Sequence, residues 1–162
     1  RFEQYREQFA FLRDNGITTR TDMAAFTART EETLANLMKQ RTVLNVRRKR
    51  RRALYTALAD AEALAPVKEL YEAGLSGMET EFAQYMDAVA ALEQCGVPRE
   101  GLIQEKAELY DRLAELNRQI RAERRKLALC RKTQNSLPRM EQEIDKAEAR
   151  ESEVRTNEHR RR

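Results

Sequence analysis

The chain has 162 residues, of which 31 are basic and 27 acidic, and its formal net charge is +4. Its hydrophobic content is 41%, with no Trp and only five Phe and five Tyr. Globular domains typically reach about 45–50% apolar residues, so this composition argues against a thick core. Abundant Ala, Glu, Leu and Arg are instead typical of long helices that meet along thin apolar seams.

Cysteine content and hydropathy indicate the cellular compartment in which the protein is expected. Cys95 and Cys130 are too few for a disulfide framework and have no metal-ligand spacing around them, which indicates a reducing environment. No apolar run approaches the roughly 18 residues of a membrane span, and no signal peptide is visible. We expect a cytoplasmic protein without membrane contact. Because the chain begins with Arg1 rather than Met, we expect a piece of a longer protein.

The first predicted helix covers residues 1–14. Its apolar residues recur every three or four positions and form one stripe, Phe2, Tyr5, Phe9 and Leu12. Gly16 is the expected left-handed residue that ends this helix. Thr19 or Thr21 can then cap the next helix.

The second predicted helix covers residues 20–74 and is kinked at Pro66, which lacks an amide hydrogen and clashes with the preceding turn. Gly74 closes it. Its apolar face is weak around Arg41 and Arg48. That face consists of Met23, Phe26, Leu34, Leu37, Leu44, Leu54, Leu58 and Leu70.

The third predicted helix, 77–94, is the most apolar one. Its face consists of Met78, Phe82, Tyr85, Met86, Val89 and Leu92. Met-rich faces can form adaptable partner grooves, but packing across the tip of a helical hairpin is the favoured interpretation. Gly96 and Pro98 end this helix.

The fourth predicted helix covers 100–155 and is interrupted near Pro138, leaving residues 156–162 as a frayed basic tail. Its apolar residues alternate steps of four and three and so form a coiled-coil seam, broken only at Glu123 and Gln134. The seam consists of Leu109, Leu113, Leu116, Ile120, Leu127, Cys130 and Leu137, and Met140, Ile144 and Ala147 continue the spacing.

These elements predict an all-α fold, an elongated antiparallel coiled-coil hairpin with a short N-terminal helix and a helical tip, in one module over 1–155. The second and fourth helices have nearly equal lengths, which suits antiparallel pairing. The alternative is a serial three-helix bundle in which these two helices run parallel. The two packings place the basic residues differently.

Charge is unevenly distributed. Residues 41–53 carry seven basic and no acidic residues, whereas 54–100 carry two basic and nine acidic ones. The basic run consists of Arg47, Arg48, Lys49, Arg50, Arg51 and Arg52. Equal pairing of the rods places it level with Lys126, in a zone that consists of Arg118, Arg121, Arg124, Arg125, Lys126, Arg131 and Lys132.

Two interpretations of these cations stay open. Merged into one belt, they would repel one another unless an anion bound them, and Arg suits bidentate phosphate contact. The belt would then contact a nucleic-acid backbone with little dependence on sequence. Otherwise the run is a solvated face that pairs with the acidic tip of another copy. A basic leucine zipper is disfavoured because Pro66 follows the run too soon.

The residue pattern indicates no catalytic site. The one His, His159, lies near the C-terminus, and no His, Cys or carboxylate cluster has metal-site spacing. There is no Gly-rich phosphate loop and no nucleophile–base pair. We therefore expect no enzyme activity, no metal, no cofactor and no small-molecule substrate.

The order of elements resembles a known family. The segment Phe11-Leu12-Arg13-Asp14-Asn15-Gly16-Ile17-Thr18-Thr19 is similar to its "FL…GI-T" turn, and Ala65-Pro66-Val67-Lys68-Glu69-Leu70-Tyr71 is similar to its "PV…Y" motif. A short helix that ends in Cys95-Gly96-Val97 and a long Glu/Leu/Arg helix follow. This succession, over about 1–150, resembles the C-terminal helical region of bacterial relaxases, the mobilisation nucleases of plasmids and conjugative elements.

The resemblance implies a separate N-terminal nuclease domain with a Tyr nucleophile and a His-ligated metal. None of those residues has a counterpart here, so no catalytic role is transferred. The chain would be a non-catalytic accessory region that contacts DNA, accessory transfer proteins or a second copy. The basic run departs from the pattern expected at that point of the family. The competing hypothesis is a structural coiled-coil module that dimerises and binds no nucleic acid.

Overall fold

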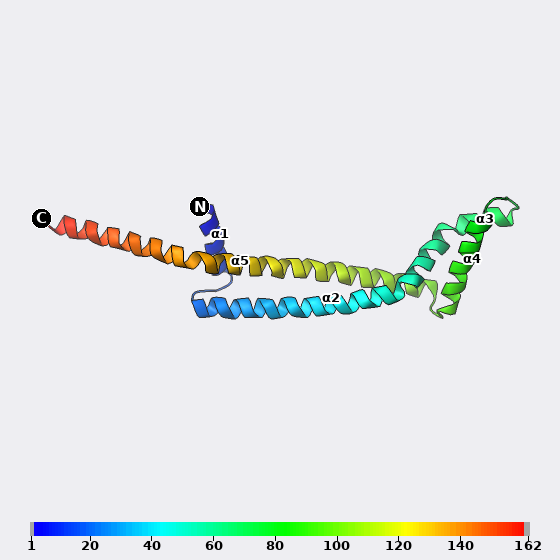
Figure 1. Cartoon of the computed structure of the whole chain (residues 1–162), viewed down its shortest axis with the longest axis horizontal. Coiled ribbons are helices and arrows are strands. Elements are labelled where there is room, and N and C mark those ends of the chain that lie inside the picture. The colour runs from blue at the N-terminus through cyan, green and yellow to red at the C-terminus, as the bar shows by residue number, and fades with distance from the viewer. Residues whose placement is uncertain (1, 161–162) are drawn as a thin grey trace. The chain divides into compact units, whose positions relative to one another are not determined.

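The structure is a computed structural model that describes residues 2–160 (Figure 1). Side chains are described for residues 5–139, 141–143 and 145–156. Within this range the chain is helical with no strand, which confirms the all-α prediction. The helices are α1 (Phe2–Asp14), α2 (Arg20–Ala63), α3 (Ala65–Glu72), α4 (Glu79–Gln94) and α5 (Arg99–Arg160).

Two compact units divide these helices. The middle unit comprises residues 36–120, and the terminal unit comprises residues 1–35 and 121–162. Both long helices, α2 and α5, contribute to both units.

In the middle unit, α2 and α5 run antiparallel. The Gln40 side chain accepts a hydrogen bond from Arg112 at 3.1 Å, and farther along α2 Arg51 reaches Glu105 at 3.2 Å. Positions that advance along one helix thus meet positions that recede along the other. The helical-hairpin prediction is confirmed, and the alternative with parallel second and fourth helices is wrong.

Three helices meet in the core of the middle unit. Ala57 and Ala61 on α2 are buried, and their small side chains allow close approach of the neighbouring helix. Leu102 at the start of α5 is fully buried in the same cluster. The complete buried cluster consists of Tyr55, Ala57, Leu58, Ala61, Ala88, Leu92, Leu102, Leu109 and Leu113.

The helix expected over 20–74 is divided in two. The first part, α2, ends at Ala63, and α3 begins at Ala65 with Pro66 in its first turn. Proline fits there because the first amides of a helix have no intrahelical acceptor. The resulting α3 packs on α4, where Tyr71 stacks on Phe82 with ring centroids 4.1 Å apart. These two helices form the tip, and they lie outside the paired part of α2.

In the terminal unit, α1 ends in a tight glycine turn. Gly16 has φ of 62°, the left-handed region that suits glycine. The amide of Gly16 donates to the Arg13 carbonyl, and that of Ile17 donates to the Leu12 carbonyl at 2.9 Å. This is a Schellman motif, and Leu12 and Ile17 share its apolar contact.

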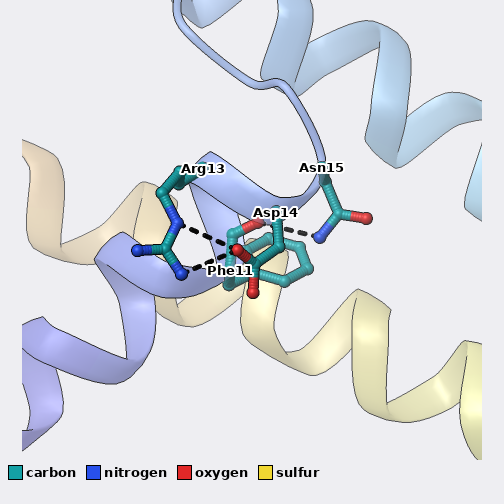
Figure 2. A network of polar contacts seen from close by, with 4 residues as sticks. All are labelled: Phe11, Arg13, Asp14 and Asn15. Atoms are coloured by element: carbon teal, nitrogen blue, oxygen red, sulfur yellow. Dashed lines mark hydrogen bonds and ion pairs between the residues drawn. The ribbon is translucent and has the colours of Figure 1, made fainter.

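Side chains reinforce this turn (Figure 2). The Asn15 side-chain amide turns back to donate to the Phe11 carbonyl at 2.8 Å, and the Asn15 backbone amide donates to the same carbonyl at 3.2 Å. Arg13 closes over Asp14 with two hydrogen bonds to one carboxylate oxygen. Both side chains of that pair are exposed, so the pair contributes little stability.

A capping box begins α2. The Asp22 carboxylate accepts a hydrogen bond from the Thr18 hydroxyl at 2.8 Å and from the amides of Thr18 and Thr19, while the Asp22 amide donates to the Thr19 hydroxyl. These hydrogen bonds lower the pKa of Asp22 from the ordinary 3.8 to about 2. The Thr18 hydroxyl contributes most to this shift, followed by the Thr18 amide.

The core of the terminal unit is small and partly polar. Phe11 packs edge-on against Phe26 at 5.6 Å between centroids, beside buried Met23 and Cys130. The Gln8 amide donates to the Ser136 hydroxyl on α5 at 3.3 Å. Figure 1 shows α1 against α5 at this point.

The α5 seam follows the predicted spacing. Six of the expected residues are buried, Leu109, Leu113, Leu116, Ile120, Leu127 and Cys130. Leu137 is half-buried, and fully buried Thr133 replaces the next apolar position. Ala147 is exposed, and the side chains of Met140 and Ile144 lie outside the described residues.

The structure of α5 differs from the prediction at Pro138 and at its C-terminal end. The helix passes through Pro138 without a break and extends to Arg160, beyond the expected end at 155. Pro138 is exposed, so water can reach the carbonyl of the preceding turn that loses its helical partner. Residues 161–162 of the expected basic tail, and the side chain of His159, lie outside the described residues.

The apolar face of α2 is thinner than predicted. Met23 and Leu58 are buried, but Leu34, Leu37 and Leu44 are only half-buried. Leu70, which belongs to α3, is exposed. No residue from 31 to 54 is fully buried. The contact of α2 with α5 therefore leaves most of this stretch of α2, including the basic run, in solvent.

Candidate functional site

The basic run occupies almost two turns of α2 in the middle unit. Because successive helical residues are rotated by about 100°, six consecutive cations cannot share one face. Arg51 is half-buried and the other five side chains are exposed. The structure divides the run into one side that contacts an acidic residue and another side that lines a groove.

On the first side, Glu105 of α5 binds three donors. The Arg51 Nε lies 3.2 Å from the carboxylate, the Arg47 Nη2 lies 3.8 Å away, and the Tyr55 hydroxyl donates to it at 3.1 Å. The Glu105 side chain is only 18% exposed. Burial, and next the hydrogen bond to Glu105, raises the pKa of Tyr55. This part of the run therefore attaches α2 to α5.

On the second side, α2 and α5 border an open groove of about 720 Å³. The residues of α2 that line it recur every three or four positions, so they form a stripe along one flank of the helix. The complete lining consists of Asn45, Arg48, Lys49, Arg52, Tyr55, Thr56, Ala59, Lys106 and Tyr110. All nine are described, and none of them is acidic. We call this feature the basic groove.

The cations of the basic groove lack acidic partners. None of Arg48, Lys49 and Arg52 forms an ion pair with any residue whose side chain the structure describes. Lys106 places its Nζ 5.9 Å from the centroid of the Tyr55 ring, a cation–π contact that leaves its charge uncompensated. Four uncompensated cations around one groove attract anions.

The α5 zone differs from the basic groove because most of its described cations have acidic neighbours. Lys126 pairs with Glu123 at 2.7 Å, and Arg118 pairs with Glu115. Arg121 also has an interaction partner.

Two further pairs reach from α5 to other helices of the terminal unit. Arg131 lies 4.0 Å from Glu31, and Lys132 lies 3.4 Å from Glu7. Only Arg124 and Arg125 remain exposed with no ion pair to a described residue. The positive charge of the α5 zone is thus largely compensated by acidic side chains of the same chain.

The predicted register of the two rods is wrong. The run was expected level with Lys126, but Arg47 and Arg51 contact Glu105 instead. The basic run lies in the middle unit, whereas the α5 zone beyond Arg118 lies in the terminal unit. Helix α4, which the equal-length argument did not include, packs on the end of α2, where Gln84 donates a hydrogen bond to Asp60 at 3.3 Å. Residues 65–72 form the separate helix α3 and do not extend the paired rod.

Comparison with known proteins supplies no family for this chain. No protein-family model, curated protein or solved structure matches it.

Two other features are absent from the described residues. No group of three His, Cys, Asp or Glu side chains among them is arranged to hold a metal ion. No helix in that part of the chain is both long and apolar enough to cross a membrane.

Sequence reasoning missed the α5 side of the groove. Lys106 and Tyr110 come one helical turn apart, and Glu105 precedes them. Their position opposite the basic run depends on the register between α2 and α5, which appears only in the structure, where Leu109 and Leu113 share a buried cluster with Leu58 and Tyr55. Ending the paired part of α2 before Pro66 would have moved the expected partners of the basic run toward Glu105 without reaching them.

Proposed function

We propose that the chain is a non-catalytic helical module that binds nucleic-acid phosphates in the basic groove. The observation that carries this proposal is the cluster of four cations, Arg48, Lys49, Arg52 and Lys106, around a groove with no acidic lining residue. Arg presents a planar fork of donors that matches phosphate, and Lys supplies a point charge. Binding of this kind depends on salt and only weakly on sequence.

The proposed setting is DNA mobilisation. The order of helices and the motifs around Gly16 and Pro66 resemble the C-terminal helical region of relaxases, which supports an accessory role beside a separate nuclease domain. In that setting the groove would hold DNA near the site of transfer, and other surfaces would contact accessory transfer proteins. This assignment places the chain in the cytoplasm.

The test compares two pairs of substitutions within the same six residues. Arg48→Gln with Arg52→Gln removes two cations of the groove, whereas Arg47→Gln with Arg51→Gln removes two cations that contact Glu105. Both variants lose the same charge from the same helix. Fluorescence anisotropy with labelled single-stranded and duplex DNA, across ~50 to ~200 mM salt, gives affinity and salt slope.

We expect the groove variant to bind at least tenfold more weakly. Its salt slope should fall by up to ~1.8 on duplex DNA and ~1.4 on single strands, because each phosphate contact contributes ~0.9 and ~0.7, respectively. The Glu105-side variant should keep most of the salt slope and should unfold more easily. Equal losses of affinity in the two variants would show that only net charge matters. Absence of DNA binding at the lowest salt would refute the proposal itself.

One observation favours a second candidate, a coiled-coil module that self-associates without nucleic acid. The middle part of α2 leaves Val43 66% exposed and Val46 45% exposed, in a stretch, residues 31–54, in which no residue is fully buried. A second copy could cover these side chains. Analytical ultracentrifugation of the chain and of its Val43→Lys, Val46→Lys variant tests this. A dimer that the variant abolishes, in a chain that does not bind DNA, would favour this candidate.

A further inference from the structure

The basic groove contains an exposed aromatic ring that the fold does not require. Tyr110 lines the groove from α5 and is 46% exposed. It directly follows Leu109, which is 4% exposed and belongs to the core of the middle unit. A step of one residue rotates Tyr110 away from the seam and toward the flank of the helix. Its ring therefore contributes little to the packing between α2 and α5.

The other tyrosine of the groove, Tyr55, already makes contacts within the chain through both its hydroxyl and its ring. Tyr55 is 5% exposed, its hydroxyl donates to Glu105, and Lys106 lies over its ring. A ligand cannot stack on Tyr55 without displacing these contacts. Tyr110 is thus the aromatic surface that the groove offers to a ligand.

We infer that the basic groove binds single-stranded nucleic acid, with an unpaired base stacked on Tyr110 and the flanking phosphates held by Arg48, Arg52 and Lys106. This inference rests on the proposed function and names its substrate class. A cationic groove with an exposed aromatic ring is the arrangement that binds single strands without sequence preference, because every base has a stacking face. In a duplex the bases stack on one another and are not available to Tyr110.

The volume of the groove suits this ligand. About 720 Å³ falls within the roughly 300–1,000 Å³ of pockets that hold small organic ligands, so a base and its neighbouring phosphates can be accommodated. Asn45 and Thr56 line the same groove and supply polar groups that can hydrogen-bond to a base edge or to phosphate.

The experiment separates stacking from charge. Anisotropy is measured for the wild-type chain, Tyr110→Leu and Tyr110→Phe with three labelled probes of about 12 nucleotides, within the site sizes known for single-strand binders. The probes are oligothymidylate, an abasic strand with the same number of phosphates, and a duplex. Circular dichroism checks that both variants remain folded, which is expected because Tyr110 is nearly half exposed.

We expect the wild-type chain and Tyr110→Phe to bind oligothymidylate at least fivefold more tightly than the abasic strand. Tyr110→Leu should bind both strands alike, and all three proteins should bind the duplex equally. A 2-aminopurine base in the strand should be quenched by wild type and not by Tyr110→Leu.

Two failures are distinguishable. If the wild-type chain binds the probes with the expected salt dependence but Tyr110→Leu behaves identically, the stacking inference is wrong and the phosphate groove remains. If the wild-type chain binds no probe at low salt, both the groove function and the stacking inference are wrong.

Discussion

Glu105 decides how much of the basic run is available to a ligand, so Glu105→Gln should change stability and affinity in opposite directions. The carboxylate holds Arg51 at 3.2 Å and Arg47 at 3.8 Å, and both guanidinium groups are released when its charge is removed. The neutral amide can still accept the hydrogen bond from Tyr55. The substitution therefore removes charge pairing without opening a cavity.

The expected loss of stability is modest. Exposed ion pairs contribute ~0.2–1 kcal/mol each, and Arg47 is 56% exposed while Arg51 is 35% exposed. Because Glu105 itself is largely buried, we take ~1–2 kcal/mol for the two contacts together. For a chain of this length that corresponds to a lower melting temperature by roughly 2–8 °C. Thermal unfolding followed by circular dichroism measures it.

The expected gain in affinity follows from the same geometry. Two freed arginines can add up to two phosphate contacts, which steepens the salt slope of DNA binding by up to ~1.8. Glu108→Gln is the matched control, since exposed Glu108 on the same helix bonds Gln104 and no arginine. The reasoning would be refuted if Glu105→Gln weakened DNA binding, or if its salt slope equalled that of the control.

Three further predictions concern folding. Leu116→Ala removes a fully buried seam residue and should lower the free energy of unfolding by ~2–5 kcal/mol in urea titration, while Leu75→Ala, at a 48% exposed site, should change it by less than ~0.5 kcal/mol. Gly16→Ala should lower the free energy of unfolding by ~1–2 kcal/mol, because Gly16 has a φ of 62°. Gly101→Ala should raise it by ~0.4–1 kcal/mol, because Gly101 lies inside α5 and an added Cβ would meet only an ordinary 3.5 Å contact with Val97. Changes of the same sign in both variants would contradict the backbone argument. The Asp22 pKa of about 2 lies below its ordinary 3.8, so the folded state binds fewer protons there and stability should fall as pH falls through that window, a dependence that Asp22→Asn should remove in acid titration followed by circular dichroism.

Local sequence rules predicted much of the fold because they act within a helix. The spacing of Leu109, Leu113 and Leu116 identified the seam of α5, and all three are buried. Gly16 identified the end of α1, where the left-handed turn is found. Such signals need no knowledge of which helix lies opposite.

The register between helices could not be predicted in the same way. It depends on where the paired part of α2 stops and on which helices pack beside its end. Leu64 keeps right-handed helical dihedrals between α2 and α3, and α3 packs on α4, a contact that no local signal around Pro66 specifies. Pro138 has the opposite outcome to Pro66. Its side chain is exposed to solvent, and α5 continues through it. Proline alone marks a strained position and leaves the outcome to tertiary contacts.

The division of the basic run has a physical consequence for the fold. Arg48, Lys49, Arg52 and Lys106 repel one another across the groove, and this repulsion acts against the contact between α2 and α5. Glu105 offsets part of it by attracting Arg47 and Arg51 to α5 one helical face away. If stability alone determined these positions, a second carboxylate in the groove would lower the repulsion. The phosphates of a bound strand would lower the same repulsion, so under the proposed function added strands should raise the melting temperature of the chain.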